Sequence, residues 1–130
     1  MIPEPKWISL KTLQLLHEQQ LERFGGRPGI LDRGVVESAL NRPRNRYLYG
    51  GDEVDLAELA AAYLYAFAQS QGFADGNKRT AVAAMLVFLA INGHPLHVPG
   101  VELYQVTMAV ADEKVRMTEA AVAAWLREHI

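Results

Sequence analysis

The chain has 130 residues, of which 50% are hydrophobic and 22% are charged, a balance typical of globular rather than disordered proteins. This length favours a single domain, and no linker or low-complexity tract divides the chain, so we expect one domain over residues 1–130. The net charge of −2 gives no support for binding to nucleic acid or to a membrane surface. The absence of cysteine excludes disulfides and thiolate metal sites.

The chain shows no sign of export or of a membrane span. Residues 1–4 lack the basic and apolar regions of a signal peptide. The longest apolar run, residues 81–91, has eleven residues and is too short to cross a bilayer as a helix. We therefore expect a cytoplasmic protein that contacts no membrane.

Two helices are predicted in the first third of the chain. Leucines at near-helical spacing predict a helix with Ser9 as its N-cap that stops at Gly25-Gly26. Asp32 is the cap of a second helix, which we expect to end before Pro43. Residues 44–52 then carry tyrosines ahead of a Gly-Gly turn. They predict a short hairpin or an extended flap, with a surface loop that covers core as the alternative.

Four more helices follow. Residues 55–58 form a capping box that begins the third helix. The fourth begins near Asn77 and ends at Asn92-Gly93, and from Ala81 onward it is apolar on every face, so we expect it to be the buried central helix of a bundle. Two further helices are expected, over residues 101–111 and from Thr118 onward. The predicted fold is an all-α helical bundle around a central apolar helix.

The loop before the fourth helix carries the residues that point to chemistry. A helix N-terminus offers unpaired N–H groups and a partial positive charge to an anion, and Gly76 lets the backbone approach a ligand closely. Asn77 can cap the helix or donate its amide to a phosphate oxygen. Lys78 and Arg79 add cations, which oppose the helix macrodipole at this end and therefore favour an anionic ligand.

Asp75 is the one carboxylate of this loop. Beside phosphates, a single carboxylate typically binds Mg²⁺, because this ion keeps several waters and takes only one or two protein oxygens. Phe73 is expected to anchor the loop on the core. The simpler alternative is a plain turn and helix cap followed by surface cations, with no ligand at all.

Phe73, Asp75 and the run from Gly76 to Arg79 resemble the loop of the Fic/Doc family, whose pattern is His-x-Phe-x-(Asp/Glu)-Gly-Asn-(Gly/Lys)-Arg. Lys78 stands where the adenylylating Fic branch has glycine, and Val82 where that branch has a second arginine. Both differences point to the Doc (death-on-curing) branch. The similarity covers most of the chain and includes the stretches 24–26, 29–34, 88–89, 92–93 and 125–126.

The resemblance implies an all-helical toxin of a bacterial toxin–antitoxin pair. Doc-type proteins use Mg²⁺ and a nucleoside triphosphate such as ATP, and they transfer the terminal phosphate to a hydroxyl of elongation factor Tu. A cognate antitoxin silences them by laying a helix along the toxin surface. By the same resemblance Asp75 would hold magnesium, Gly76–Arg79 would bind the phosphates, and residues 44–52 would align the target chain.

Gln71 departs from the family pattern, in which a histidine takes the proton from the attacking hydroxyl. A carboxamide does not titrate near neutral pH, and the loss of a general base typically lowers the rate by roughly 10²–10⁴. His94 and His97 follow the far end of the fourth helix, about 20 Å from the loop. His129 lies among the terminal residues. His17 cannot be placed from the sequence, and we expect none of the four to replace the base.

The leading hypothesis is therefore a Doc-type kinase toxin impaired at Gln71, in which Asp75, Lys78 and Arg79 complete the catalytic set. Gln71 is either natural or a substitution that allows a toxic protein to be produced. Gly72 is expected to loosen the loop. The alternatives are a Fic-type adenylyltransferase, against which Lys78 weighs, and a catalytically dead protein that binds antitoxin or nucleotide.

Overall fold

The computed structural model describes all 130 residues and consists of helices without strands. The six helices are α1 (Leu10–Phe24), α2 (Arg33–Tyr49), α3 (Leu56–Gln69), α4 (Asn77–Ile91), α5 (Gly100–Ala111) and α6 (Glu119–Arg127). A single antiparallel bridge pairs Ile30 with Phe73. The predicted all-α bundle is thus confirmed.

The predicted helix starts agree with the structure because short polar side chains cap them. Ser9 Oγ accepts a hydrogen bond from the Thr12 N–H at the start of α1. Asp55 Oδ1 does the same for the Glu58 N–H at the start of α3. Each cap satisfies a backbone N–H that has no partner within its helix.

The prediction that α2 ends before Pro43 is wrong, because the helix continues to Tyr49. Proline removes one backbone hydrogen bond from a helix, but here packing beyond it keeps the helical path. Pro43 and Tyr47 are both buried, and the Tyr47 hydroxyl donates to the carbonyl oxygen of Ile2 at 3.0 Å. Residues 44–49 are consequently helical, and the predicted hairpin or flap is absent.

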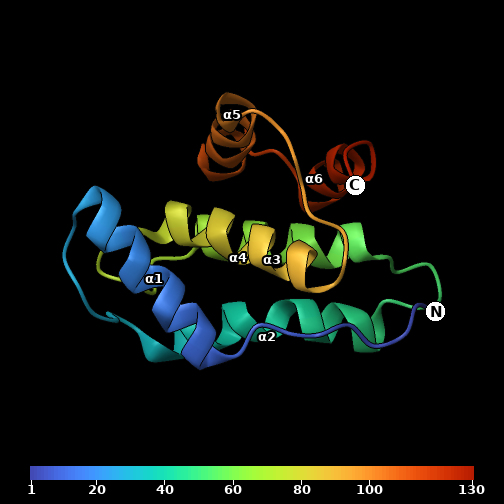
Figure 1. Cartoon of the computed structure of the whole chain (residues 1–130), viewed down its shortest axis with the longest axis horizontal. Coiled ribbons are helices and arrows are strands. Elements are labelled where there is room, and N and C mark those ends of the chain that lie inside the picture. The colour runs from blue at the N-terminus through green and yellow to red at the C-terminus, as the bar shows by residue number, and fades with distance from the viewer.

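The central helix of the bundle is α3, and the prediction that α4 holds this place is wrong. Helix α3 contacts α2, α4, α5 and α6, and nine of its 14 residues are buried. In Figure 1, α3 and α4 lie together in the middle, with α2 on one side and α5 and α6 on the other. One face of α4 stays partly open, because Val82 and Leu86 line a cavity.

The last two helices follow the sequence prediction closely. Helix α5 begins one residue before the expected position, and Thr118 caps α6 as expected. Helix α6 packs Leu126, which is fully buried, against the core. None of the six helices combines the length and the apolarity that crossing a bilayer requires.

Candidate functional site

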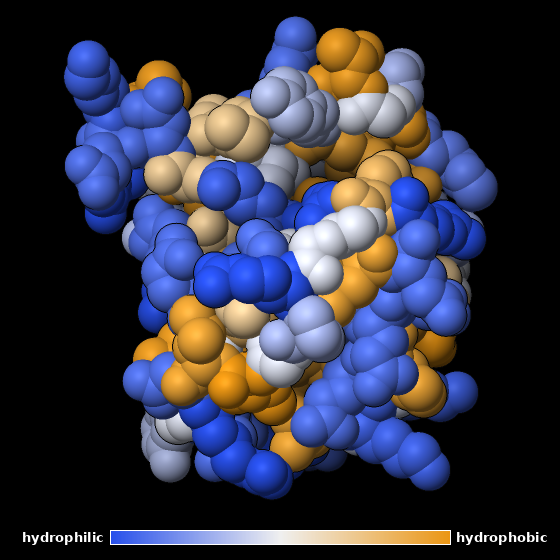
Figure 2. All heavy atoms as spheres, turned by 90° about the vertical axis from the view of Figure 1, so that its left-hand side faces the viewer, coloured by the Kyte–Doolittle hydropathy of each residue, from blue (hydrophilic) through white to orange (hydrophobic).

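The loop between α3 and α4 borders a cavity of about 700 Å³. Its walls come from the loop, the second half of α1, the outer face of α4, and α5. Figure 2 looks at the end of the molecule where this loop lies, and hydrophilic and apolar side chains are neighbours there. The structure brings all the site residues expected from the sequence to this one cavity: Gln71, Asp75, Gly76, Asn77, Lys78 and Arg79.

The N-terminus of α4 faces this cavity without a capping side chain. Gly76 precedes the helix in a left-handed conformation, with φ 77° and ψ 19°, which an L-residue with a side chain adopts only with strain. The first helical hydrogen bond runs from the Thr80 N–H to the Gly76 carbonyl oxygen. The N–H groups of residues 77–79 have no acceptor, and no acidic side chain lies in the first turn. Such a terminus is suited to bind an anion.

The side chain of Asn77 closes the loop on itself. Its Oδ1 accepts from the Phe73 N–H, and its Nδ2 donates to the Phe73 carbonyl oxygen, each at 3.0 Å. The predicted capping role of Asn77 is therefore wrong, since Gly76 occupies the cap position. Phe73 is 1% exposed, which confirms its expected role as the anchor.

Asp75 is held at the cavity as an ionised carboxylate. Its Oδ2 accepts a hydrogen bond of 2.8 Å from the Arg27 N–H and lies 3.7 Å from the Arg27 Nε. The Arg27 N–H, followed by the guanidinium charge, holds the pKa of Asp75 below its ordinary value.

These properties fit the predicted magnesium ligand, because Mg²⁺ beside phosphates needs only one or two carboxylate oxygens from the protein. The structure contains no group of three or more His, Cys, Asp or Glu residues that could hold a metal ion. Asp75 is the one carboxylate among the residues that line the cavity, so it is the side chain that could hold such an ion there.

Three cations surround the cavity. The Arg79 guanidinium donates to the Gly25 carbonyl oxygen at 3.2 Å and lies over the ring of Phe24, 5.1 Å from its centroid. Lys78 is exposed and makes no ion pair. Arg23, from the last turn of α1, also lines the cavity. Sequence reasoning missed Arg23, because no local pattern shows that the end of α1 lies opposite the start of α4.

The remaining wall of the cavity is largely apolar. It combines Val82 and Leu86 of α4 with residues of α5, which sequence reasoning also missed: Leu103, Tyr104, Thr107 and Met108. Tyr104 is 65% exposed, so an aromatic ring stands at the open side. The cavity therefore has one charged end and one apolar wall.

His17, which could not be placed from the sequence, contacts the loop. It is 4% exposed, and its Nε2 lies 2.7 Å from the carbonyl oxygen of Asp75. It does not line the cavity, so it is not placed to act as a base there. A signal for its burial was present: position 17 is four residues after Leu13 and four before Leu21, within the apolar stripe of α1.

Gly72 fixes the loop rather than loosening it, so this prediction is wrong. A Cβ atom at Gly72 would lie 2.6 Å from Val36 Cγ2. The carbonyl oxygen of Gly72 accepts hydrogen bonds from the N–H groups of Leu31 and Asp32. Gln71, the next residue toward α3, is exposed on the cavity, and its side chain makes no hydrogen bond.

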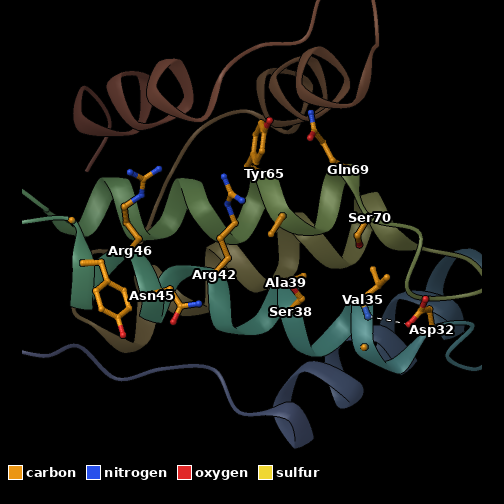
Figure 3. A pocket seen from close by; sticks show the side chains of 14 residues that line it. Asp32, Val35, Ser38, Ala39, Arg42, Asn45, Arg46, Tyr65, Gln69 and Ser70 are labelled. Atoms are coloured by element: carbon orange, nitrogen blue, oxygen red, sulfur yellow. Dashed lines mark hydrogen bonds between the residues drawn. The ribbon is translucent and has the colours of Figure 1, made fainter.

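A second hollow, a groove of about 850 Å³, runs between α2 and α3. Figure 3 shows Arg42 rising from α2 beside Tyr65 of α3, with Arg46 farther along α2. The Arg42 guanidinium lies 5.0 Å from the centre of the Tyr65 ring. Ser70 lines this groove, and its neighbour Gln71 lines the cavity, so the start of the α3–α4 loop separates the two hollows. Residues 45, 46, 49 and 50 of the expected flap line the groove and not the cavity.

Comparison with known proteins shows the family of this chain. Residues 7–89 match the family described as Fic/DOC. A relative named Protein kinase doc, from Escherichia phage P1, is 36% identical over 115 residues, which cover 88% of this chain and 89% of the relative. A relative named Toxin Doc, from Mycolicibacterium smegmatis, is 44% identical over 71 residues, 54% of each chain. The chain belongs to the Fic/Doc family.

Proposed function

We propose that this chain is a Doc-type toxin, a kinase that transfers the terminal phosphate of ATP or another nucleoside triphosphate to a protein hydroxyl. The target we propose is elongation factor Tu, so that the reaction blocks translation. The observation that carries the proposal is the cavity, where an uncapped helix N-terminus, the cations Lys78 and Arg79, and the ionised Asp75 meet. The names of the two relatives, a kinase and a toxin, support it.

The two parts of the cavity match the two parts of a nucleoside triphosphate. The charged end offers the free N–H groups of residues 77–79 and the guanidinium of Arg79, which suit phosphate oxygens. The apolar wall of α4 and α5, with the exposed ring of Tyr104, suits a nucleobase. A volume of about 700 Å³ is within the range of small-molecule sites.

We propose that Asp75 holds the Mg²⁺ that accompanies the triphosphate. When bound, this ion neutralises charge on the phosphate oxygens. The chain itself contributes position and charge: Arg27 fixes one oxygen of Asp75, and Phe24 and Gly25 hold the head group of Arg79 at the cavity.

The weak point of this site is proton transfer. In the proposed reaction the substrate hydroxyl oxygen forms a bond to the terminal phosphorus, the bond from that phosphorus to the leaving diphosphate breaks, and the hydroxyl proton passes to solvent water or to a phosphate oxygen. Gln71 can orient the hydroxyl by hydrogen bonding but cannot accept this proton. Because phosphoryl transfer depends mainly on positioning and electrostatics, we propose a slow kinase rather than an inert one.

Gln71 also favours a second candidate, a protein that binds nucleotide or a cognate antitoxin without catalysis. An antitoxin protein is in either case the partner that we propose for a Doc-type chain. Adenylyl transfer of the Fic type is the third possibility. Adenylyl transfer would attach the nucleotide's α-phosphate to the target, whereas kinase activity would attach the γ-phosphate.

The decisive test is transfer of label from γ-³²P-ATP to elongation factor Tu by the chain as it stands and by Gln71→His. We expect the substitution to raise the rate by about 10²–10⁴. A matched control is Gln20→His, which places a histidine on the α1 wall of the same cavity. This substitution should leave the rate of label transfer unchanged. Label from α-³²P-ATP would indicate adenylylation instead.

Binding is tested separately from chemistry. ATP with Mg²⁺ should raise the melting temperature of the chain, because a ligand that binds only the folded state stabilises it. Asp75→Asn keeps an oxygen that accepts from Arg27 but removes the charge, and it should abolish the part of the shift that depends on Mg²⁺. A chain that binds ATP while Gln71→His stays inactive is the non-catalytic candidate. A chain that binds no ATP contradicts the proposal.

A further inference from the structure

His17 contacts the α3–α4 loop from α1 and does not line the cavity. It is 4% exposed, whereas Asp75, Gly76 and Asn77 of the loop line the cavity and His17 does not. Its ring stacks on Phe73 at a centroid distance of 3.9 Å and an angle of 14°. A polar ring in this position is buried between α1 and the loop rather than exposed to a ligand.

The one polar contact of His17 fixes a backbone group. Its Nε2 is 2.7 Å from the carbonyl oxygen of Asp75. A carbonyl oxygen only accepts, so Nε2 carries the proton and donates it to this bond. The hydrogen bond holds the Asp75 carbonyl pointing toward α1.

The direction of this carbonyl determines the direction of the next N–H group. In a planar trans peptide the C=O and the N–H point to opposite sides, so the Gly76 N–H points away from His17. That N–H has no acceptor in the protein. Gly76 lines the cavity. Its φ of 77° lies in the left-handed region, which glycine adopts without strain because it has no Cβ. The bond from His17 is therefore the one hydrogen bond that this peptide group makes.

We propose that His17 is a positioning residue, which orients the Asp75–Gly76 peptide so that the Gly76 N–H is presented to a phosphate group in the cavity. This inference rests on the proposed nucleotide site. Arg27 complements it, because its N–H fixes the side chain of Asp75 while His17 fixes the main chain. Both contacts come from α1 and the segment that follows it, so this part of the chain supports the loop.

The test separates the two contacts of His17 by substitution. His17→Phe keeps a ring against Phe73 and removes the N–H donor, whereas His17→Gln keeps an N–H donor near the position of Nε2. We expect His17→Phe to weaken binding of ATP with Mg²⁺ at least tenfold and His17→Gln to retain it within about threefold, as measured by calorimetry. If His17→Phe does not fold, His17→Met provides a flexible apolar side chain without a donor.

The control is Leu13→Ala, a buried position one turn earlier on the same helix. It should lower the melting temperature and leave ATP affinity unchanged, which distinguishes positioning from general stability. In the Gln71→His background, His17→Phe should lower kcat/KM for ATP as well.

Amide hydrogen exchange provides a readout that needs no catalysis. In the free protein the Ala74 N–H donates to the Gly29 carbonyl oxygen. His17→Phe should speed exchange at Ala74, and it should remove the protection that ATP gives to Gly76. Exchange and affinity equal to the wild type in His17→Phe would overturn the inference. If the wild type binds no ATP, the proposed function fails, and unchanged exchange at Ala74 in His17→Phe would still overturn the positioning role.

Discussion

Among single residues, Gly72 shows how tightly the α3–α4 loop is packed against α2. A Cβ atom there would lie 2.6 Å from Val36 Cγ2 and 3.2 Å from the Val36 backbone nitrogen. Gly72→Ala should therefore lower the free energy of unfolding by about 1–3 kcal/mol, the usual effect of adding a methyl group to a filled space. Chemical denaturation measures this. Gly100→Ala is the matched control, since a Cβ there meets nothing within 4 Å; equal effects of the two substitutions would contradict the packing argument.

The sequence predicted which loop residues lie together at the cavity better than it predicted their individual contacts. Asp75, Gly76, Lys78 and Arg79 stand together in the chain, so a local pattern was enough to bring them to one place. The partners of the loop were not predictable in this way. His17 lies 58 positions from Asp75, and its contact depends on how α1 packs, which no local pattern records.

At the level of helices, α6 is joined to the bundle by charged side chains. Glu119, whose side chain is 11% exposed, pairs with Arg42 at 2.8 Å and with Arg46 at 2.6 Å. Glu119→Gln should lower the free energy of unfolding by about 1–3 kcal/mol, because two arginines lose a shielded charged acceptor. Glu37→Gln, which removes an exposed pair with Arg33, should cost at most about 0.5 kcal/mol. Urea unfolding of both variants measures the difference, and equal losses would show that Glu119 behaves as an ordinary surface charge.

Helix starts were predicted correctly, and the end of α2 was not, for one physical reason. A cap is a contact between residues two or three positions apart, so the caps Ser9, Asp32 and Asp55 can be recognised from the local sequence. Whether a helix survives a proline depends on distant packing. Beyond Pro43, the buried ring of Tyr47 and its bond to Ile2 favour continuation, and neither contact is visible in the local sequence.

For the whole molecule, the same limit explains why the cavity was predicted only in part. Its charged end comes from one loop, but its walls come from α1, α4 and α5. The all-α class followed from periodicity and caps. The identity of the central helix did not, because α3 and α4 are both strongly apolar and only the packing of α2, α5 and α6 around α3 decides between them. That all 130 residues form one domain stays a prediction.

Two carboxylates make the stability of the molecule depend on pH. Burial alone would raise the pKa of Asp55, but hydrogen bonds from the Arg127 side chain and the Glu58 N–H outweigh it and hold this pKa below its ordinary value. The pKa of Asp75 is lowered as well, mainly by the Arg27 N–H. A lowered pKa in the folded state means that the unfolded chain binds protons first as the pH falls. The stabilisation is therefore complete near neutral pH and is lost below about pH 4.

Asp55→Asn isolates the part of this pH-dependent stabilisation that comes from the ion pair between Asp55, at the start of α3, and Arg127 of α6. Asparagine caps a helix as well as aspartate, so the substitution removes the charge that Arg127 meets and keeps the cap. We expect a lower melting temperature at pH 7 and a smaller further drop between pH 5 and pH 3 than in the wild type. Asp52→Asn, at an exposed position without an ion pair, should keep the wild-type profile. If Asp55→Asn loses as much stability in acid as the wild type, the acid sensitivity arises elsewhere, and the pair with Arg127 does not hold α6 in place.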